Sequence, residues 1–140
     1  MQKQLLALAA IAAFTCNAVT QTRAIGFKEG APFSQGVVAG KTLYVAGTEG
    51  PDANGKLEGD IAQQTTAAIA GIKKTVEAAG FKMEDIVSVT VFISDLADVP
   101  KMNEVYKSLM PNPKPARATV KVAGLIGNAK IEISAIAVKQ

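Results

Sequence analysis

Residues 114–138 read KPARATVKVAGLIGNAKIEISAIAV, and this stretch decides which fold the chain takes. β-branched and small apolar residues recur in two runs, at 118–123 and 130–138, which predicts two strands. In the second run the odd-numbered residues 131–137 share one face and the even-numbered residues 132–138 share the other. Both faces are mostly apolar. The second strand is therefore expected to lie in the centre of a sheet and to be covered on both sides.

This central strand carries one carboxylate, Glu132, among apolar neighbours. A buried and unpaired glutamate would cost several kcal/mol if it stayed charged, so Glu132 should have a partner or a raised pKa. Arg117 stands at the start of the preceding strand. If the two strands form a hairpin through residues 124–128, Arg117 lies near one end of the pair. The pairing register decides whether it reaches Glu132, and the sequence leaves that register open.

The Arg117 and Glu132 pair permits two interpretations. The first is a structural ion pair, within the chain or at a subunit interface, and spacing alone favours this one because structural networks also perturb pKa values. The second is functional. Arginine is a bidentate clamp for carboxylates, and glutamate can serve as a base that holds a water molecule.

A helix is predicted upstream, after a polar loop at residues 48–59. Asp60 is a good N-cap, and Gln63 stands three residues later as in a capping box. Apolar residues then recur at helical spacing, which predicts one buried face. Gly80 is suited to ending this helix in a left-handed conformation.

The remaining elements complete a simple order. Residues 34–38 and 42–46 predict two short strands joined by a tight turn, and residues 86–94 (IVSVTVFIS) predict a buried strand. Asp98 can cap a second helix, with Pro100 in its first turn. The order is β-β-α-β-α-β-β. Helices of this length need a sheet face to cover, which predicts a two-layer α+β sandwich.

Length and composition narrow the functional classes. The chain has 140 residues, enough for one domain, and 49% of them are hydrophobic, which indicates a folded core. The net charge of +3 arises from dispersed residues, so nucleic-acid binding is not favoured. There is no histidine and only one cysteine. A histidine base, a zinc site and an intrachain disulfide are therefore not expected.

The first segment, residues 1–18, reads MQKQLLALAAIAAFTCNA and has the form of a signal peptide. Lys3 precedes an apolar run at 5–14, and small residues at positions 16 and 18 suit cleavage after Ala18. The run is shorter than the ~20 residues that span a bilayer, so no stable membrane insertion is expected. The alternative is a buried N-terminal helix. The favoured interpretation predicts a periplasmic or secreted protein, with a polar arm at 19–29 and one domain at 30–140.

Four stretches of the chain resemble, in order, the RidA/YjgF family of reactive imine and enamine deaminases. They read APFSQGVVAGKTLYVAG, AAGFKMEDIVSVTVFISDLADVPKMNEVY, PARATVKVAGL and IEISAIAV, and they span roughly residues 30–138. The resemblance implies a chorismate-mutase-like α+β fold and a homotrimer with clefts between adjacent subunits. It implies that Arg117 binds the substrate carboxylate and that Glu132 lies near the attacking water. Ala46 and Gly47 match a family segment that lines the cleft.

The chain also departs from the family pattern at several cleft positions. Phe33 stands where the family usually has tyrosine, and Ala46 and Thr48 stand where it has serine and glutamine. Thr119 replaces a frequent cysteine, and Ile126 replaces a proline. By the resemblance Phe33 and Thr119 are still substrate-binding positions, but polar contacts are lost. For Phe33 an alternative is an aromatic packed under a loop as part of the core.

The resemblance implies hydrolysis of 2-iminopropanoate and 2-iminobutanoate to 2-keto acids and ammonia. An imine is already electrophilic, so anchoring it and delivering water is sufficient, and no cofactor or metal is expected. The alternative is a non-catalytic trimer that binds small carboxylates or acts like a chaperone; the lost hydroxyls and the expected export favour it. A nuclease role ranks third. The expected partners are a small imino or keto acid and two further copies of the chain, and not nucleic acid.

Overall fold

A computed structural model of the chain describes residues 21–140. The expected signal peptide at 1–18 lies outside these residues, so its cleavage and the location of the mature protein stay predictions. Within residues 21–140, no helix is both long enough and apolar enough to cross a membrane.

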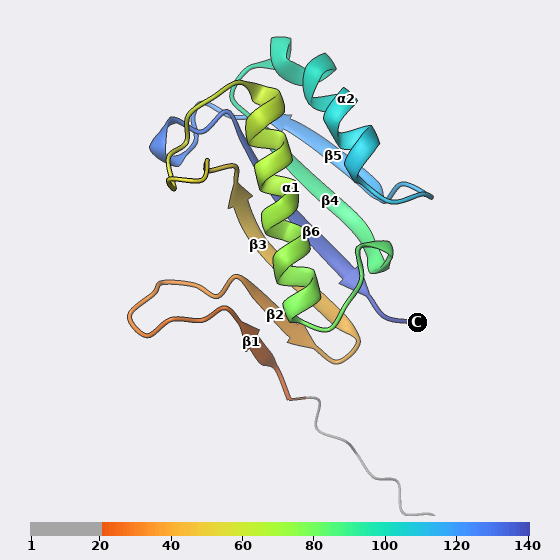
Figure 1. Cartoon of the computed structure of the whole chain (residues 1–140). Coiled ribbons are helices and arrows are strands. Elements are labelled where there is room, and N and C mark those ends of the chain that lie inside the picture. The colour runs from red at the N-terminus through yellow and green to blue at the C-terminus, as the bar shows by residue number, and fades with distance from the viewer. Residues whose placement is uncertain (1–20) are drawn as a thin grey trace, which may run out of the picture.

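Six strands form one sheet, and two α-helices cover one of its faces (Figure 1). The strands are β1 (Arg23–Ile25), β2 (Gly36–Ala39), β3 (Thr42–Glu49), β4 (Ile86–Ile93), β5 (Ala116–Lys121) and β6 (Ile131–Val138). The helices are α1 (Ile61–Ala78) and α2 (Val99–Leu109), and three 3₁₀ turns are η1 (Met83–Asp85), η2 (Leu96–Asp98) and η3 (Ile126–Asn128). This arrangement confirms the predicted two-layer α+β fold.

Helix α1 begins as its sequence predicts. The Asp60 carboxylate accepts a hydrogen bond from the Gln63 backbone N–H at 2.9 Å, and Gln63 Oε1 accepts one from the Asp60 N–H at 2.9 Å. This reciprocal capping box satisfies two N–H groups that a helix start would otherwise leave unpaired. Gly80 follows the helix with φ +79°, a conformation that suits glycine.

Helix α2 begins differently from the expectation at Asp98. The Asp98 side chain makes no capping hydrogen bond, and its backbone is already helical, with φ −79° and ψ −13°. The preceding turn η2 runs directly into α2, and Asp95 caps that turn by accepting from the Ala97 N–H at 3.0 Å. An N-cap residue needs an extended backbone, which Asp95 has and Asp98 lacks. The capping residue is therefore Asp95, at the start of η2. Pro100 lies in the first turn of α2, as predicted.

One strand was not predicted, and another extends beyond its predicted limits. β1 lies inside the segment expected to be an arm, and it pairs antiparallel with β2. β3 continues to Glu49, although residues 48 and 49 were expected to begin the loop. Its pairing with β6 shifts between Val45 and Thr48, which marks a β-bulge. The bulge lets β3 bend and continue pairing past Gly47.

The last two strands do not form the hairpin that was considered from the sequence as one arrangement. The sheet order is β1-β2-β3-β6-β4-β5, so β4 lies between β5 and β6. β5 pairs with β4 in parallel. Helix α2 connects the two strands along the chain, as parallel strands need a crossover connection and this is usually a helix. β6 pairs antiparallel with both β3 and β4 and is central, as predicted.

Among residues 21–140 only one face of β6 is covered, so the cover on both faces expected from the sequence is absent from this part of the chain. Its residues Ile131, Ile133, Ala135 and Ala137 are buried under the helices. The alternate residues are half-buried and lie on the face opposite the helices. By the strand register this open face carries the apolar side chains of Val37, Tyr44, Phe92, Val120, Ile136 and Val138. Tyr44 is 51% exposed and Val120 44% exposed, so the open face is largely apolar and uncovered.

Candidate functional site

Arg117 lies on the edge strand β5 and projects toward α2. Its register partner on β4 is Val89, which is buried, so Arg117 belongs to the helix-covered side of the sheet. The guanidinium carbon lies 4.6 Å from the centroid of the Tyr106 ring, and Nη1 lies 4.0 Å from the Met102 sulfur. Among residues 21–140 no carboxylate pairs with Arg117. The guanidinium is thus held against an aromatic face while its charge stays available to an anion.

The surroundings of Arg117 are basic and carry two unpaired hydroxyls. A pocket of about 350 Å³ is lined by Asn103, Tyr106, Lys107, Lys114, Pro115 and Arg117. The Tyr106 hydroxyl and Thr119 Oγ1 are both buried, and neither has a hydrogen-bond partner in the described chain. Burial raises the pKa of Tyr106, while the charge of Arg117 lowers it. Thr119 is two residues from Arg117 and lies on the same strand face.

Glu132 lies on the other side of the sheet. Its neighbours across the strands are Glu49 on β3 and Phe92 on β4. Burial raises the pKa of Glu132, and the nearby charge of Glu49 raises it further. No lysine or arginine of residues 21–140 forms an ion pair with Glu132. A half-buried carboxylate with a raised pKa and no counter-ion is suited to taking up a proton.

The β3 bulge makes room for this carboxylate. A Cβ atom added to Gly47 would overlap the Glu132 side chain, so the absence of a side chain at position 47 is what admits it. The Ala46 N–H donates to the Gln35 carbonyl at 2.9 Å, which ties the bulge to the loop that carries Phe33. The Phe33 side chain is 56% exposed, so it is not the core aromatic that the alternative interpretation proposed.

The predicted residues, together with Tyr106 and Glu49, fall into two half-sites. The arginine half-site comprises Tyr106, Arg117 and Thr119, and the glutamate half-site comprises Ala46, Gly47, Glu49 and Glu132. Phe33 lies on the loop that Gln35 ties to the bulge. Arg117 lies in register with Val89 and Ala135, whereas Glu132 is three residues farther along β6. Two strand spacings and three residues separate the two Cα atoms by about 14 Å, and odd spacing places the side chains on opposite faces. The interpretation of an ion pair within one chain is wrong.

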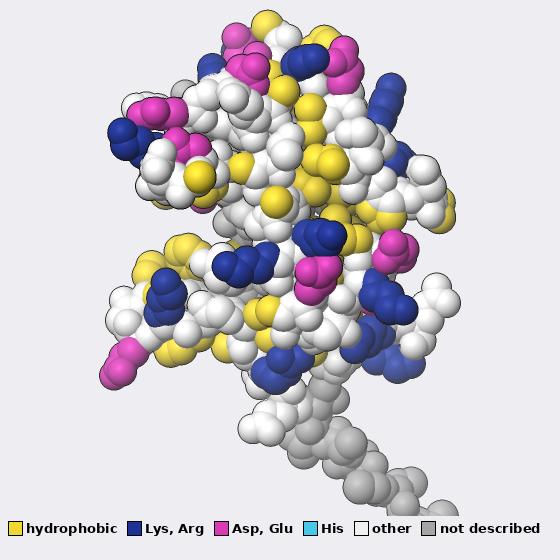
Figure 2. Space-filling model, viewed as in Figure 1, with side chains coloured by type: hydrophobic (Ala, Val, Ile, Leu, Met, Phe, Trp, Pro, Cys, Tyr) yellow, Lys and Arg dark blue, Asp and Glu magenta, His cyan; other side chains and the backbone are white. Residues whose placement is uncertain are grey.

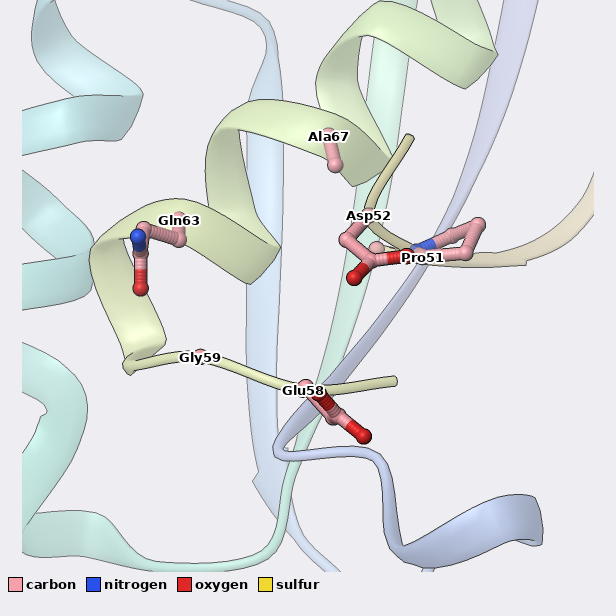
Figure 3. Close-up of a pocket in the computed structure, with 7 residues that line it drawn as sticks. Pro51, Asp52, Glu58, Gly59, Gln63 and Ala67 are labelled. Atoms are coloured by element: carbon pink, nitrogen blue, oxygen red, sulfur yellow. The ribbon is translucent and has the colours of Figure 1, made fainter. Parts of the chain in front are cut away.

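A pocket of about 160 Å³ lies elsewhere, between the 50–59 loop and the first turns of α1 (Figure 3). Figure 3 shows Asp52 and Glu58 on the two arms of this loop, with Gln63 on the helix. The Asp52 carboxylate accepts from the N–H groups of Asn54 and Lys56, and Glu58 pairs with Lys56 Nζ at 3.5 Å. Gln63 is engaged in the capping box. These polar groups hold the loop itself, so the pocket is part of the scaffold.

The surface over the helices has no continuous basic tract. Figure 2 shows acidic and basic side chains interspersed on that side of the molecule. Residues 21–140 also contain no group of three or more potential metal-ligating side chains. Neither observation adds a nucleic-acid or metal site to the two half-sites.

Two residues of the half-sites were not predicted from the sequence. Tyr106 was expected only as part of the buried stripe of a helix, and its contact with Arg117 depends on how α2 packs over β5. Glu49 was expected in a loop. Its position next to Glu132 follows from the bulge in β3. A single glycine in a strand, such as Gly47, is not enough to predict that bulge from the sequence.

Comparisons with known proteins agree with this fold. The family model described as endoribonuclease L-PSP matches residues 23–139. A RutC family protein from Pyrococcus horikoshii is 41% identical over 111 residues, covering 78% of this chain and 88% of that protein. A protein from Dermatophagoides farinae named 2-iminobutanoate/2-iminopropanoate deaminase is 41% identical over 109 residues, covering 76% and 85%. The crystal structure of the YjgF gene product from E. coli superposes with a TM-score of 0.74 at 37% identity, covering 79% and 90%. The chain therefore belongs to the endoribonuclease L-PSP family, which is the RidA/YjgF family.

Proposed function

We propose that the protein is a hydrolytic deaminase that converts 2-iminopropanoate and 2-iminobutanoate to 2-keto acids and ammonia. The observation that carries the proposal is that neither Arg117 nor Glu132 has an ion-pair partner among residues 21–140. Both residues stand at positions that match the family pattern, Arg117 against the Tyr106 ring and Glu132 with a raised pKa. Relatives that share 36–41% of their residues with this chain are named 2-iminobutanoate/2-iminopropanoate deaminases, which supports the same chemistry here.

The site is proposed to form between subunits of a homotrimer. The half-sites lie on opposite faces of the sheet, so a substrate could touch both only if a second copy supplied one of them. The open apolar face, with Tyr44 and Val120 exposed, offers a surface for such association. A ring of three copies, as the family resemblance implies, would repeat one head-to-tail contact three times. Each contact would place the arginine half-site of one copy beside the glutamate half-site of the next.

In this arrangement Arg117 binds the substrate carboxylate through two parallel N–H···O bonds. Glu132 accepts a proton from a water molecule as the water oxygen bonds to C2 of the imine. The C=N π electrons move to nitrogen, which takes this proton from Glu132, and a neutral carbinolamine forms. Glu132 then accepts the hydroxyl proton of the carbinolamine and passes it to the nitrogen, the C–N bond breaks as the C=O bond forms, and ammonia and the 2-keto acid leave. Imine and water are consumed, and the carboxyl group of Glu132 returns to its starting state.

The raised pKa of Glu132 is what this sequence of steps needs. A general base works best when its pKa approaches the working pH, because it must both accept and return the proton. A fully solvated glutamate would accept the proton poorly. Arg117, in contrast, never gives up its proton, so it contributes binding and orientation and no proton transfer.

Release of keto acid from freshly generated 2-iminopropanoate tests the proposal. The imine is produced in place by an amino-acid oxidase, and its disappearance is followed with and without the chain lacking residues 1–18. We expect decay well above the spontaneous rate, with stoichiometric ammonia, and loss of that excess in Arg117→Ala and Glu132→Gln. An unchanged decay rate with correctly assembled protein would contradict the proposal.

A second candidate is a trimer that binds small carboxylates without turnover. It is favoured by the exposed Phe33 and by Ala46, which put apolar groups where the family usually has hydroxyls. Titration calorimetry with 2-oxobutanoate separates the two functions when it is combined with the turnover assay. Saturable binding that depends on Arg117 without any acceleration of imine decay would favour the binding protein.

A further inference from the structure

We propose that Glu49 is a positioning residue of the glutamate half-site: its negative charge, directly opposite Glu132 in the sheet, governs when Glu132 takes up a proton. The role of Glu49 in imine hydrolysis rests on the proposed function. Its effect on the protonation of Glu132 involves only two residues of one chain, so that effect can be measured without any turnover.

The geometry of the two strands brings the carboxyl groups together. Glu49 and Glu132 are direct partners in the register between β3 and β6, so their side chains leave the sheet on the same face. Directly opposite residues have Cβ atoms about 4.5–5.5 Å apart. Gly47 removes the one obstacle between the Glu132 side chain and β3, because a Cβ there would overlap the carboxylate. Glu132 is thereby directed over the strand that carries Glu49.

No cation of the described chain neutralises this pair. On β4 the residues that face the same side near Glu132 are Thr90 and Phe92, and on β6 the next is Ser134, none of them charged. Lys130 is two residues from Glu132 but lies before the strand, and it makes no ion pair with either glutamate. In the proposed trimer the substrate-binding Arg117 of a neighbouring copy would be the other charge facing Glu132.

Two like charges directly opposite each other are unfavourable, and protonation of one relieves the repulsion. Burial already raises the pKa of Glu132, and the charge of Glu49 raises it further. As the pH falls, Glu132 should therefore take up its proton at a higher pH than it would without Glu49 opposite it.

This coupling has a consequence for imine hydrolysis. When water attacks, one proton moves from water to Glu132, and the negative charge of Glu49 stabilises the newly protonated acid. When the proton later moves from Glu132 to nitrogen, the charge of Glu49 opposes its departure, so Glu49 assists the attack of water and not the release of ammonia. The electron pairs that move are those of the O–H and C–N bonds, and nothing is oxidised or reduced. Glu49 never touches the substrate in this scheme.

The decisive experiment is a ¹³C NMR titration of the carboxyl groups in full-length protein labelled at glutamate, assigned through Glu132→Gln. We compare wild type, Glu49→Gln and Glu84→Gln. The last removes one negative charge from the exposed turn η1, away from the half-site, and is the matched control. Glu49→Gln should lower the titration midpoint of Glu132 by about 0.5–1 pH unit, the size expected for a neighbouring charge in a half-exposed pair. Glu84→Gln should leave it unchanged.

The acid limb of the pH–rate profile gives a second readout. Activity should fall as the pH drops through the midpoint of Glu132, because the protonated acid cannot accept a proton from water. In Glu49→Gln this fall should move to lower pH by the same amount as the NMR midpoint, whereas Glu49→Asp should largely restore the wild-type profile. An unmoved Glu132 midpoint in folded Glu49→Gln overturns the inference. If the midpoint moves but wild type hydrolyses no imine, the inference stands as chemistry of the pair and the proposed function fails.

Discussion

Arg117 and Glu132 project from opposite faces of one sheet, with β4 between their strands. Neither has an oppositely charged partner among residues 21–140. A residue pair that stabilised the fold as an ion pair would have to be in contact, and this pair is not. We infer that each is half of a site that a second copy of the chain completes.

Substitution of the two residues should separate binding from chemistry. Arg117→Ala removes a bidentate charge-assisted contact, worth roughly 1.5–3 kcal/mol, and should raise KM about 10–100-fold. Glu132→Gln keeps the side-chain shape but cannot take a proton, so kcat should fall by ~10²–10⁴ with little change in KM. Steady-state kinetics with 2-iminopropanoate measures both.

Thermal unfolding of the same variants supplies the control. Because neither side chain is paired within the chain, both variants should melt within a few degrees of wild type. Heavy destabilisation together with wild-type turnover in the remaining folded fraction would show that the residues are scaffolding, since breaking a buried ion pair costs roughly 3–5 kcal/mol.

The ring of Tyr106 should matter for substrate affinity and its hydroxyl should not. The ring lies 4.6 Å from the Arg117 guanidinium, and a cation–π contact of this kind is worth about 0.5–1 kcal/mol at an exposed site. Tyr106→Leu should therefore raise KM about 2–5-fold. Tyr106→Phe should leave KM within experimental error, because the hydroxyl has no hydrogen-bond partner among residues 21–140. A larger effect of Tyr106→Phe than of Tyr106→Leu would instead assign the hydroxyl a direct role.

Gly47→Ala should disturb the Glu132 carboxylate and little else. The added methyl group would overlap that side chain, so Glu132 must move, and a displacement of about 1 Å in a catalytic group can cost up to ~10²-fold in rate. We expect kcat to fall about 10–100-fold. Gly124→Ala is the matched control, because a Cβ at position 124 meets nothing within 4 Å. Equal kinetics for the two alanine variants would argue against the placement of Glu132 beside the bulge.

The open face of the sheet should be the surface through which copies associate. Tyr44 is 51% exposed on that face, opposite Ile136 on β6. Tyr44→Asp would place a charge in the proposed contact and should shift the protein from trimer to monomer in light scattering. Leu96→Asp, at an equally exposed apolar residue on η2, should leave the mass unchanged. A wild-type protein that scatters as a monomer at micromolar concentration would remove the basis for a site between subunits.

Local sequence signals predicted the elements well. The capping box at Asp60 and Gln63 placed the start of α1 correctly, and the β-branched run at 86–94 matches β4 to within one residue. These features depend on neighbours in the chain, and the physics of capping and alternation acts over a few residues.

Features that depend on distant pairing could not be predicted in the same way. Strand β1 has only three residues, Arg23–Ile25, and one buried side chain. This is too short for an alternation of polar and apolar residues to predict a strand. The hairpin of β5 and β6 looked natural from their adjacency, yet β4 lies between them. A change in strand order alters which residues face each other without altering the pattern of any strand. For this reason the types of the site residues were predictable, and their division between two faces was not.

Complementation between inactive subunits tests whether each site combines Arg117 of one copy with Glu132 of another. Arg117→Ala and Glu132→Gln chains carrying different tags are mixed, unfolded and refolded together, and native mass spectrometry verifies that mixed trimers form. If each site takes Arg117 from one copy and Glu132 from its neighbour, random assembly leaves about one site in four with both residues intact. The account predicts that turnover of 2-iminopropanoate returns to about a quarter of the wild-type rate. Mixed trimers that remain as inactive as either variant alone would contradict it.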